Sequence, residues 1–119
     1  MQNKKKRILE IWGSGKPLRE LIFVDDIADA CIFFLKKKIK KTVINIGTGK
    51  DMRIKDYADF IIKQLKLNVK IKYNIKKPDG TYRKVMDVSR AKKFGWKAKF
   101  SLKKGFEITY KDFLSKYYK

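Results

Sequence analysis

The sequence of 119 residues contains no histidine, one cysteine and two prolines. The absence of histidine removes the commonest general base of enzyme active sites. The single cysteine, Cys31, excludes an internal disulfide framework and fits a reducing compartment, so we expect a cytoplasmic location. Long apolar runs are also missing, since Leu21–Val24 and Ala30–Leu35 are too short to cross a bilayer.

Acidic residues are scarce: 12 stand against 32 basic residues, which gives a net charge of +20. Only five of the basic residues are arginine, and the lysines are spread along the whole chain. A dedicated nucleic-acid surface more often gathers arginine beside exposed aromatic rings. The lysine bias is typical of solvated faces, although attraction to polyanions at low salt follows from the charge alone. A basic module that binds nucleic acid or other polyanions therefore stays an alternative.

The apolar pattern indicates a folded α/β chain, which we expect to form a single lobe over residues 1–119 with a charged lead-in at 1–7. Hydrophobic residues make up 44% of it, enough for a real core. Strands are predicted at 8–12, 21–24, 42–46 and 69–73. Helices are predicted for about 12 residues after Asp25 or Asp26, at 54–66, near 89–94, and from Ser101 to the end.

The first predicted helix carries the two groups most easily mistaken for chemistry. Asp25 and Asp26 are adjacent at its start, where carboxylates usually cap, and no histidine or second carboxylate cluster supports a metal site. Ile27, Cys31, Phe34 and Leu35 follow at helical spacing, so we expect a buried stripe. Cys31 is interpreted as core and not as a nucleophile.

Residues 12–19 combine a tryptophan, a glycine turn and an arginine. A guanidinium offers a planar fork for pyrophosphate oxygens, and an indole face can cover a sugar or a base. Trp12 and Arg19 are therefore candidate binding residues. The alternative is a half-buried tryptophan beside a surface arginine.

Two further loops have the composition of phosphate or nucleotide contacts. Residues 47–49, Gly-Thr-Gly, follow a predicted strand, but they lack the third glycine of a dinucleotide fingerprint, which favours a plain turn. Residues 78–84 place Asp79 beside two cations, Arg83 and Lys84, in a strong turn signal. This loop is either a nucleotide contact or an ordinary solvated turn.

Four segments, in order, resemble the carboxy-terminal portion of the GDP-L-fucose synthase family, which consists of extended short-chain dehydrogenase/reductases. They are IWGSGKPLRELIFVDDIADA, VINIGTGKD, KPDGTYRKVMDVSRAKKFGW and SLKKGFEITYKDFL. The second and part of the first are shared broadly among sugar-nucleotide epimerases. The WGSG-x-P-x-RE and KPDGT-x-RK-x-x-DV patterns are much more specific.

The resemblance implies roles for four residues. Trp12 and Arg19 would bind the GDP-sugar, Asp79 would contact its nucleotide, and Lys84 matches a basic position near the substrate. The family converts GDP-4-keto-6-deoxy-D-mannose to GDP-L-fucose by epimerisation at C3 and C5 and reduction at C4 with NADPH. The fold that it implies is a small substrate-binding lobe beside a Rossmann-like NADP-binding core.

The matching segments include no counterpart of that Rossmann half, to which the family's glycine fingerprint, catalytic Ser-Tyr-Lys set and epimerisation Cys and His belong. Cys31 lies in a different region and cannot replace that cysteine. We therefore expect no catalytic, cofactor-binding or metal residue in this chain, and we expect it alone to bind NADPH poorly and to turn nothing over. A separate Rossmann polypeptide could complete the site, and the alternative is an inert fragment.

Overall fold

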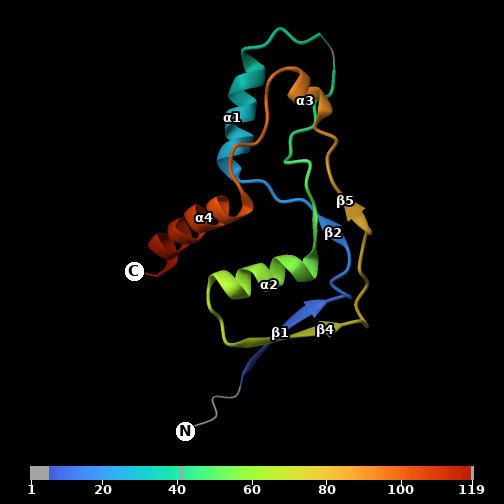
Figure 1. Ribbon diagram of the computed structural model, residues 1–119, viewed down its shortest axis with the longest axis vertical. Coiled ribbons are helices and arrows are strands. Elements are labelled where there is room, and N and C mark those ends of the chain that lie inside the picture. The colour runs from blue at the N-terminus through green and yellow to red at the C-terminus, as the bar shows by residue number, and fades with distance from the viewer. Residues whose placement is uncertain (1–5, 41, 119) are drawn as a thin grey trace. The chain divides into compact units, whose positions relative to one another are not determined.

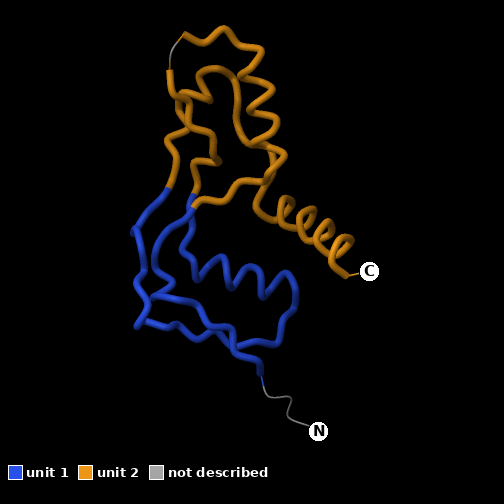
Figure 2. Tube along the Cα trace, turned by 180° about the vertical axis from the view of Figure 1, so that it is seen from behind, with its two compact units in different colours: residues 1–19, 51–84 blue, residues 20–50, 85–119 orange. Residues whose placement is uncertain are grey.

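The structure is a computed structural model that describes residues 6–40 and 42–118. The chain forms two compact units (Figure 2). Unit 1 consists of the described part of Met1–Arg19 together with Asp51–Lys84, and unit 2 of the described parts of Glu20–Lys50 and Val85–Lys119. Of the predicted lead-in, residues 1–5 lie outside the described residues, and Arg7 is already the first residue of a strand.

Unit 1 begins with a parallel strand pair. β1 (Arg7–Trp12) runs beside β4 (Val69–Asn74), with Trp12 opposite Asn74. α2 (Ile54–Gln64) runs alongside this pair (Figure 1). Both strands and the helix confirm the prediction, because each has a strong apolar period and a partner within the same unit.

A second, three-stranded sheet of very short strands completes unit 1. β2 (Leu18–Arg19) lies in its centre, antiparallel to β3 (Met52–Arg53) and parallel to β5 (Arg83–Lys84). Sequence patterns do not reveal strands of two residues, since alternation needs at least four. The pairing of β2 with β5 holds the residues that follow the Pro-Asp-Gly turn in register with Arg19.

The described part of unit 2 contains three helices, α1 (Val24–Leu35), α3 (Ser89–Lys93) and α4 (Leu102–Tyr117). Its buried centre is formed by Ala30, Ala91 and Trp96. Ser101 caps α4 as predicted, because its side chain accepts a hydrogen bond from the Lys104 backbone N–H at 3.2 Å.

The expectation that an aspartate caps α1 is wrong. The N-cap residue is Phe23, which has no side-chain capping bond. Asp26 is instead buried, and its two carboxylate oxygens accept from the backbone N–H groups of Lys99 and Phe100 at 3.0 and 3.1 Å. A buried charge needs such partners, so this aspartate ties α1 to the segment that leads into α4.

The predicted stripe on α1 is wrong at three of its four positions, since Ile27 and Leu35 are 41% and 85% exposed and Cys31 is exposed as well. Phe34, the fourth, does pack against the core, together with Ala30 and Phe33.

Two predicted strands are likewise absent from the described residues. Residues 21–23 form no strand and Val24 opens α1, while 42–46 have no ladder partner in the part of the chain that the structure describes. A strand is defined by its neighbour, and an apolar run alone does not supply one.

Candidate functional site

Unit 1 contains all four predicted site residues, and a carboxylate clamp organises two of its turns. Trp12 ends β1 and is followed by the Gly-Ser-Gly turn. Asp79 accepts from the Ser14 backbone N–H at 2.5 Å and from the Ser14 hydroxyl at 2.8 Å. These two bonds, and then the nearby Lys16 charge, lower the pKa of Asp79 below its ordinary value. The clamp therefore fixes the turn that follows Trp12 against the Pro-Asp-Gly turn.

The clamp explains why glycine stands at position 13. Gly13 has φ of +85°, and a Cβ there would collide with the Asp79 carboxylate. Only glycine meets both conditions without strain.

Trp12 presents its ring to solvent, with 66% of the residue exposed. The ammonium of Lys77 lies over the ring, 4.8 Å from its centroid. This cation–π contact holds one part of an otherwise free aromatic surface. The half-buried alternative for Trp12 is thereby excluded, and a flat aromatic surface is available for a ring-bearing ligand.

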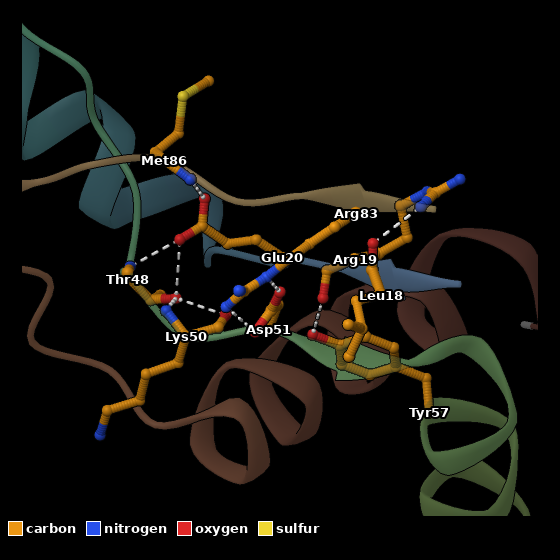
Figure 3. A network of polar contacts seen from close by, with 10 residues as sticks. Leu18, Arg19, Glu20, Thr48, Lys50, Asp51, Tyr57, Arg83 and Met86 are labelled. Atoms are coloured by element: carbon orange, nitrogen blue, oxygen red, sulfur yellow. Dashed lines mark hydrogen bonds and ion pairs between the residues drawn. The ribbon is translucent and has the colours of Figure 1, made fainter. Parts of the chain in front are cut away.

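Arg19 and Lys84 are direct neighbours in the parallel pairing of β2 with β5. Tyr57 donates its hydroxyl to the Arg19 carbonyl at 2.8 Å, and the Arg19 guanidinium donates to the Leu18 carbonyl at 2.7 Å (Figure 3). That guanidinium also reaches the Pro-Asp-Gly turn, since a Cβ built on Gly80 would lie 3.7 Å from it. The turn fixed by Asp79 and the Arg19 cation therefore adjoin each other.

The other cations of this sheet are neutralised locally. Arg53 pairs with Asp56 at 2.7 Å, and Arg83 pairs with Asp51 at 2.6 Å. The Arg83 guanidinium also lowers the pKa of Asp51. Within the described residues, neither Arg19 nor Lys84 has a carboxylate partner. Two adjacent like charges repel, so this pair favours an anion beside it.

Three residues that were not predicted from the sequence also shape the site or its surroundings. Ser14 and Lys77 hold Asp79 and Trp12, and neither type has a distinctive sequence signal on a polar turn. The third, Glu20, accepts from the Thr48 hydroxyl at 3.3 Å, the Gly49 N–H at 2.5 Å and the Met86 N–H at 3.2 Å in unit 2 (Figure 3). An acid directly before an apolar run was the available signal for it.

Glu20 also decides the role of residues 47–49. A Cβ on Gly47 would overlap the Glu20 carboxylate, and the Gly49 N–H is already donated to it. The loop therefore binds an internal carboxylate where a phosphate would otherwise lie. A phosphate group therefore finds the Gly49 N–H of this loop already occupied.

A Tyr-x-x-x-Lys spacing does occur at Tyr73 and Lys77, but on a strand and the turn after it. Burial raises the pKa of Tyr73, the direction opposite to that of an activated phenol. Lys77 contacts Trp12 instead. The described residues also hold no group of three or more potential metal ligands and no helix that could span a membrane.

Unit 2 has a cavity of its own, of about 490 Å³. The cations that line it are Lys50, Lys92, Lys97 and Lys99. Lys99 pairs with Asp29 at 3.4 Å. Loose attraction of polyanions to this hollow is expected from its charge.

Known proteins are clearly similar to this chain in sequence. The NAD dependent epimerase/dehydratase family model matches residues 1–47. A putative GDP-L-fucose synthase of Arabidopsis thaliana is 41% identical over 104 residues, which cover 87% of this chain and 32% of that protein. The GDP-L-fucose synthase of Escherichia coli is 38% identical over 113 residues, covering 87% and 35%.

This chain is similar in sequence to GDP-L-fucose synthases over most of its own length. A solved GDP-mannoheptose C4 reductase from Campylobacter jejuni with NADP bound agrees, with a TM-score of 0.77, 36% identity, and coverage of 90% of this chain and 35% of that one. The mixed helix and strand content of this chain is therefore similar to that of the matching part of this NADP-binding reductase. The chain spans about a third of the length of the curated relatives it matches.

Proposed function

We propose that this chain is the GDP-sugar-binding, carboxy-terminal portion of a GDP-L-fucose synthase, the enzyme type that turns GDP-4-keto-6-deoxy-D-mannose into GDP-L-fucose. Arg19 and Lys84 would meet the diphosphate, and Trp12 would cover a ring of the ligand. Asp79 would contact the nucleotide, in addition to anchoring the turn after Trp12.

The observation that carries the proposal is the pairing of Arg19 with Lys84 in one strand register without an acidic partner. Charge-assisted hydrogen bonds from a guanidinium to phosphate oxygens are short, strong and directional. The exposed Trp12 ring and the Asp79 clamp belong to the same unit. Names of the relatives support a GDP-sugar as the ligand.

Hydride and proton transfer would come from a Rossmann part that the family carries and that could here be a separate polypeptide. NADP would bind in that part, since the glycine loop of this chain is filled by Glu20. Alone, the chain would bind the GDP-sugar and turn nothing over. A cytoplasmic location remains a prediction from the single cysteine.

The test is calorimetric titration of the purified chain with GDP. We expect Arg19→Ala to weaken binding about 10- to 100-fold, since hydrogen bonds to charged groups contribute about 1.5–3 kcal/mol. Lys84→Ala should weaken it less, because a lysine acts as a point charge. Arg53→Ala is the matched control: it removes the same charge from the neighbouring strand, where Asp56 already neutralises it.

The same titration separates the alternatives. A basic polyanion module would lose affinity equally in Arg19→Ala and Arg53→Ala and would show a steep dependence on salt. An inert fragment would show no saturable GDP binding in any variant. Either result contradicts the proposed GDP-sugar site.

A further inference from the structure

The cavity of unit 2 combines an apolar wall with positive charge. Val88, Trp96 and Ala98 form the apolar part, and the first two are buried. The other lining residues are Gly47, Thr48 and the four lysines Lys50, Lys92, Lys97 and Lys99. No acidic residue lines the cavity within the part of the chain that the structure describes. A hollow with low-dielectric walls and charge of one sign concentrates its field, so this cavity favours an anion.

The four lysines come from three separate parts of unit 2. Lys50 follows the 47–49 loop, Lys92 lies on α3, and Lys97 and Lys99 belong to the segment between α3 and α4. A run of neighbouring lysines would be typical of a solvated tract, but this group is assembled by the tertiary structure. Like charges repel, and an anion held between them removes that repulsion.

Within the described residues, three of these lysines form no ion pair: Lys50, Lys92 and Lys97. Lys99 is the exception, because its ammonium lies 3.4 Å from the Asp29 carboxylate. The Lys50 side chain extends away from the Glu20 carboxylate (Figure 3). Three positive charges around the cavity are therefore not balanced by a carboxylate.

The walls of the cavity are held in place by contacts inside unit 2. Glu20 accepts hydrogen bonds from the Thr48 hydroxyl and the Gly49 N–H, which fixes the loop before Lys50. Trp96 is 2% exposed, and its indole N–H donates to Asp29 at 2.9 Å. A ligand that enters a preformed cavity orders only the lysine side chains, so little of the binding free energy is lost to ordering of the backbone.

We propose that this cavity is a second ligand site, which takes a compact anion with two or three linked phosphate groups. Its volume of about 490 Å³ lies within the range of small-ligand pockets, about 300–1,000 Å³. A single phosphate group carries about −1.5 to −2 charges at pH 7, which is less than three lysines balance. Lysine ammonium groups bind phosphate readily and donate in several directions. The residues proposed to bind the GDP-sugar belong to unit 1, so this site goes beyond that function and does not depend on it.

The test is calorimetric titration of the full chain with inorganic triphosphate at about 0.15 M salt. It is carried out in a Trp12→Phe, Arg19→Ala background, which removes the candidate ligand contacts of unit 1. We expect saturable binding, accompanied by a change in the emission of Trp96, which lines the cavity and is then the single tryptophan. Lys92→Gln should weaken binding about tenfold, the lower end for a hydrogen bond to a charged group. Lys93→Gln is the matched control, since it removes the same charge from the next residue of α3, which does not line the cavity.

Two results would overturn the site. One is the absence of saturable triphosphate binding, and the other is an equal loss of affinity in Lys92→Gln and Lys93→Gln, which is the behaviour of diffuse charge. Both lysines are exposed, so the urea midpoints of the two variants should match that of the background and confirm that the comparison concerns binding.

Titration with ATP identifies the source of the phosphate groups. Equal affinities for ATP and inorganic triphosphate, both lowered by Lys92→Gln, assign the site to the phosphate chain alone. Tighter binding of ATP with the same sensitivity assigns it to a nucleotide. The GDP titration compares Arg19→Ala with Arg53→Ala in unit 1, so failure of the GDP-sugar site and failure of this cavity are distinguishable.

Discussion

Replacement of Asp26 by alanine tests how unit 2 is held together. The carboxylate is 1% exposed and accepts from two backbone N–H groups, those of Lys99 and Phe100, at 3.0 and 3.1 Å. It thereby connects the first turn of α1 to residues more than seventy positions later. Alanine removes both acceptors and leaves two donors without their partner.

The size of the loss follows from those two bonds. Each hydrogen bond to a charged group contributes about 1.5–3 kcal/mol, and an orphaned buried donor costs about 1–3 kcal/mol. Water that enters the space left by the carboxylate recovers part of this energy. We therefore expect the free energy of unfolding to fall by about 3–5 kcal/mol. Small domains have about 5–15 kcal/mol of total stability, so unit 2 should lose a large fraction of its own.

The assay is urea unfolding followed by tryptophan fluorescence in a Trp12→Phe background. Trp96 then reports alone, and it is suited to this because it is buried and donates to Asp29 at 2.9 Å. The matched control is Asp25→Ala, which removes the neighbouring charge and only its interaction with the helix dipole, about 0.3–1 kcal/mol. If Asp26→Ala destabilises no more than Asp25→Ala, the two bonds do not hold unit 2 together.

Three further predictions concern single contacts. The pKa of Asp79 is lowered in the folded chain, so its clamp on Ser14 is fully present above the ordinary carboxyl pKa and is lost as the pH falls through the lowered pKa. An acid titration of the Ser14 amide resonance should show this step, and Asp79→Asn should abolish it. Gly49→Ala should cost about 1–2 kcal/mol in thermal unfolding, because φ is +72° and a Cβ would lie 2.9 Å from Val88; Gly80→Ala has a similar φ but more open space and should cost less, and the reverse order would refute the steric argument. Arg53→Ala should leave the urea midpoint unchanged, since its ion pair with Asp56 is exposed, and a clear drop would contradict this.

The sequence determined the elements whose stabilising pattern is local. α2 follows from its apolar period, α4 from its apolar period and the Ser101 cap, and β1 and β4 from short apolar or alternating runs. The family resemblance also selected Trp12, Arg19, Asp79 and Lys84, which the structure places in one unit. Their roles toward a ligand remain predictions.

Tertiary structure decided what depends on partners distant in sequence. Asp26 reads as a cap from its neighbours, but residues 99 and 100 make it a buried anchor. The glycine loop at 47–49 reads as an open turn or a phosphate site, but Glu20 fills it. The register of β2 with β5 places Arg19 beside Lys84, although the two residues are 65 positions apart in the sequence.

Only the structure shows which apolar residues of α1 lack a packing partner. From sequence alone, residues 27, 31 and 35 form an apolar stripe, and every apolar stripe suggests burial. The packing of unit 2 turns a different face of α1 inward, because Ala30 permits close approach to Ala91 and Trp96. The sequence by itself therefore determined which residues are apolar, and the tertiary structure decided which of them are packed against other residues of this chain.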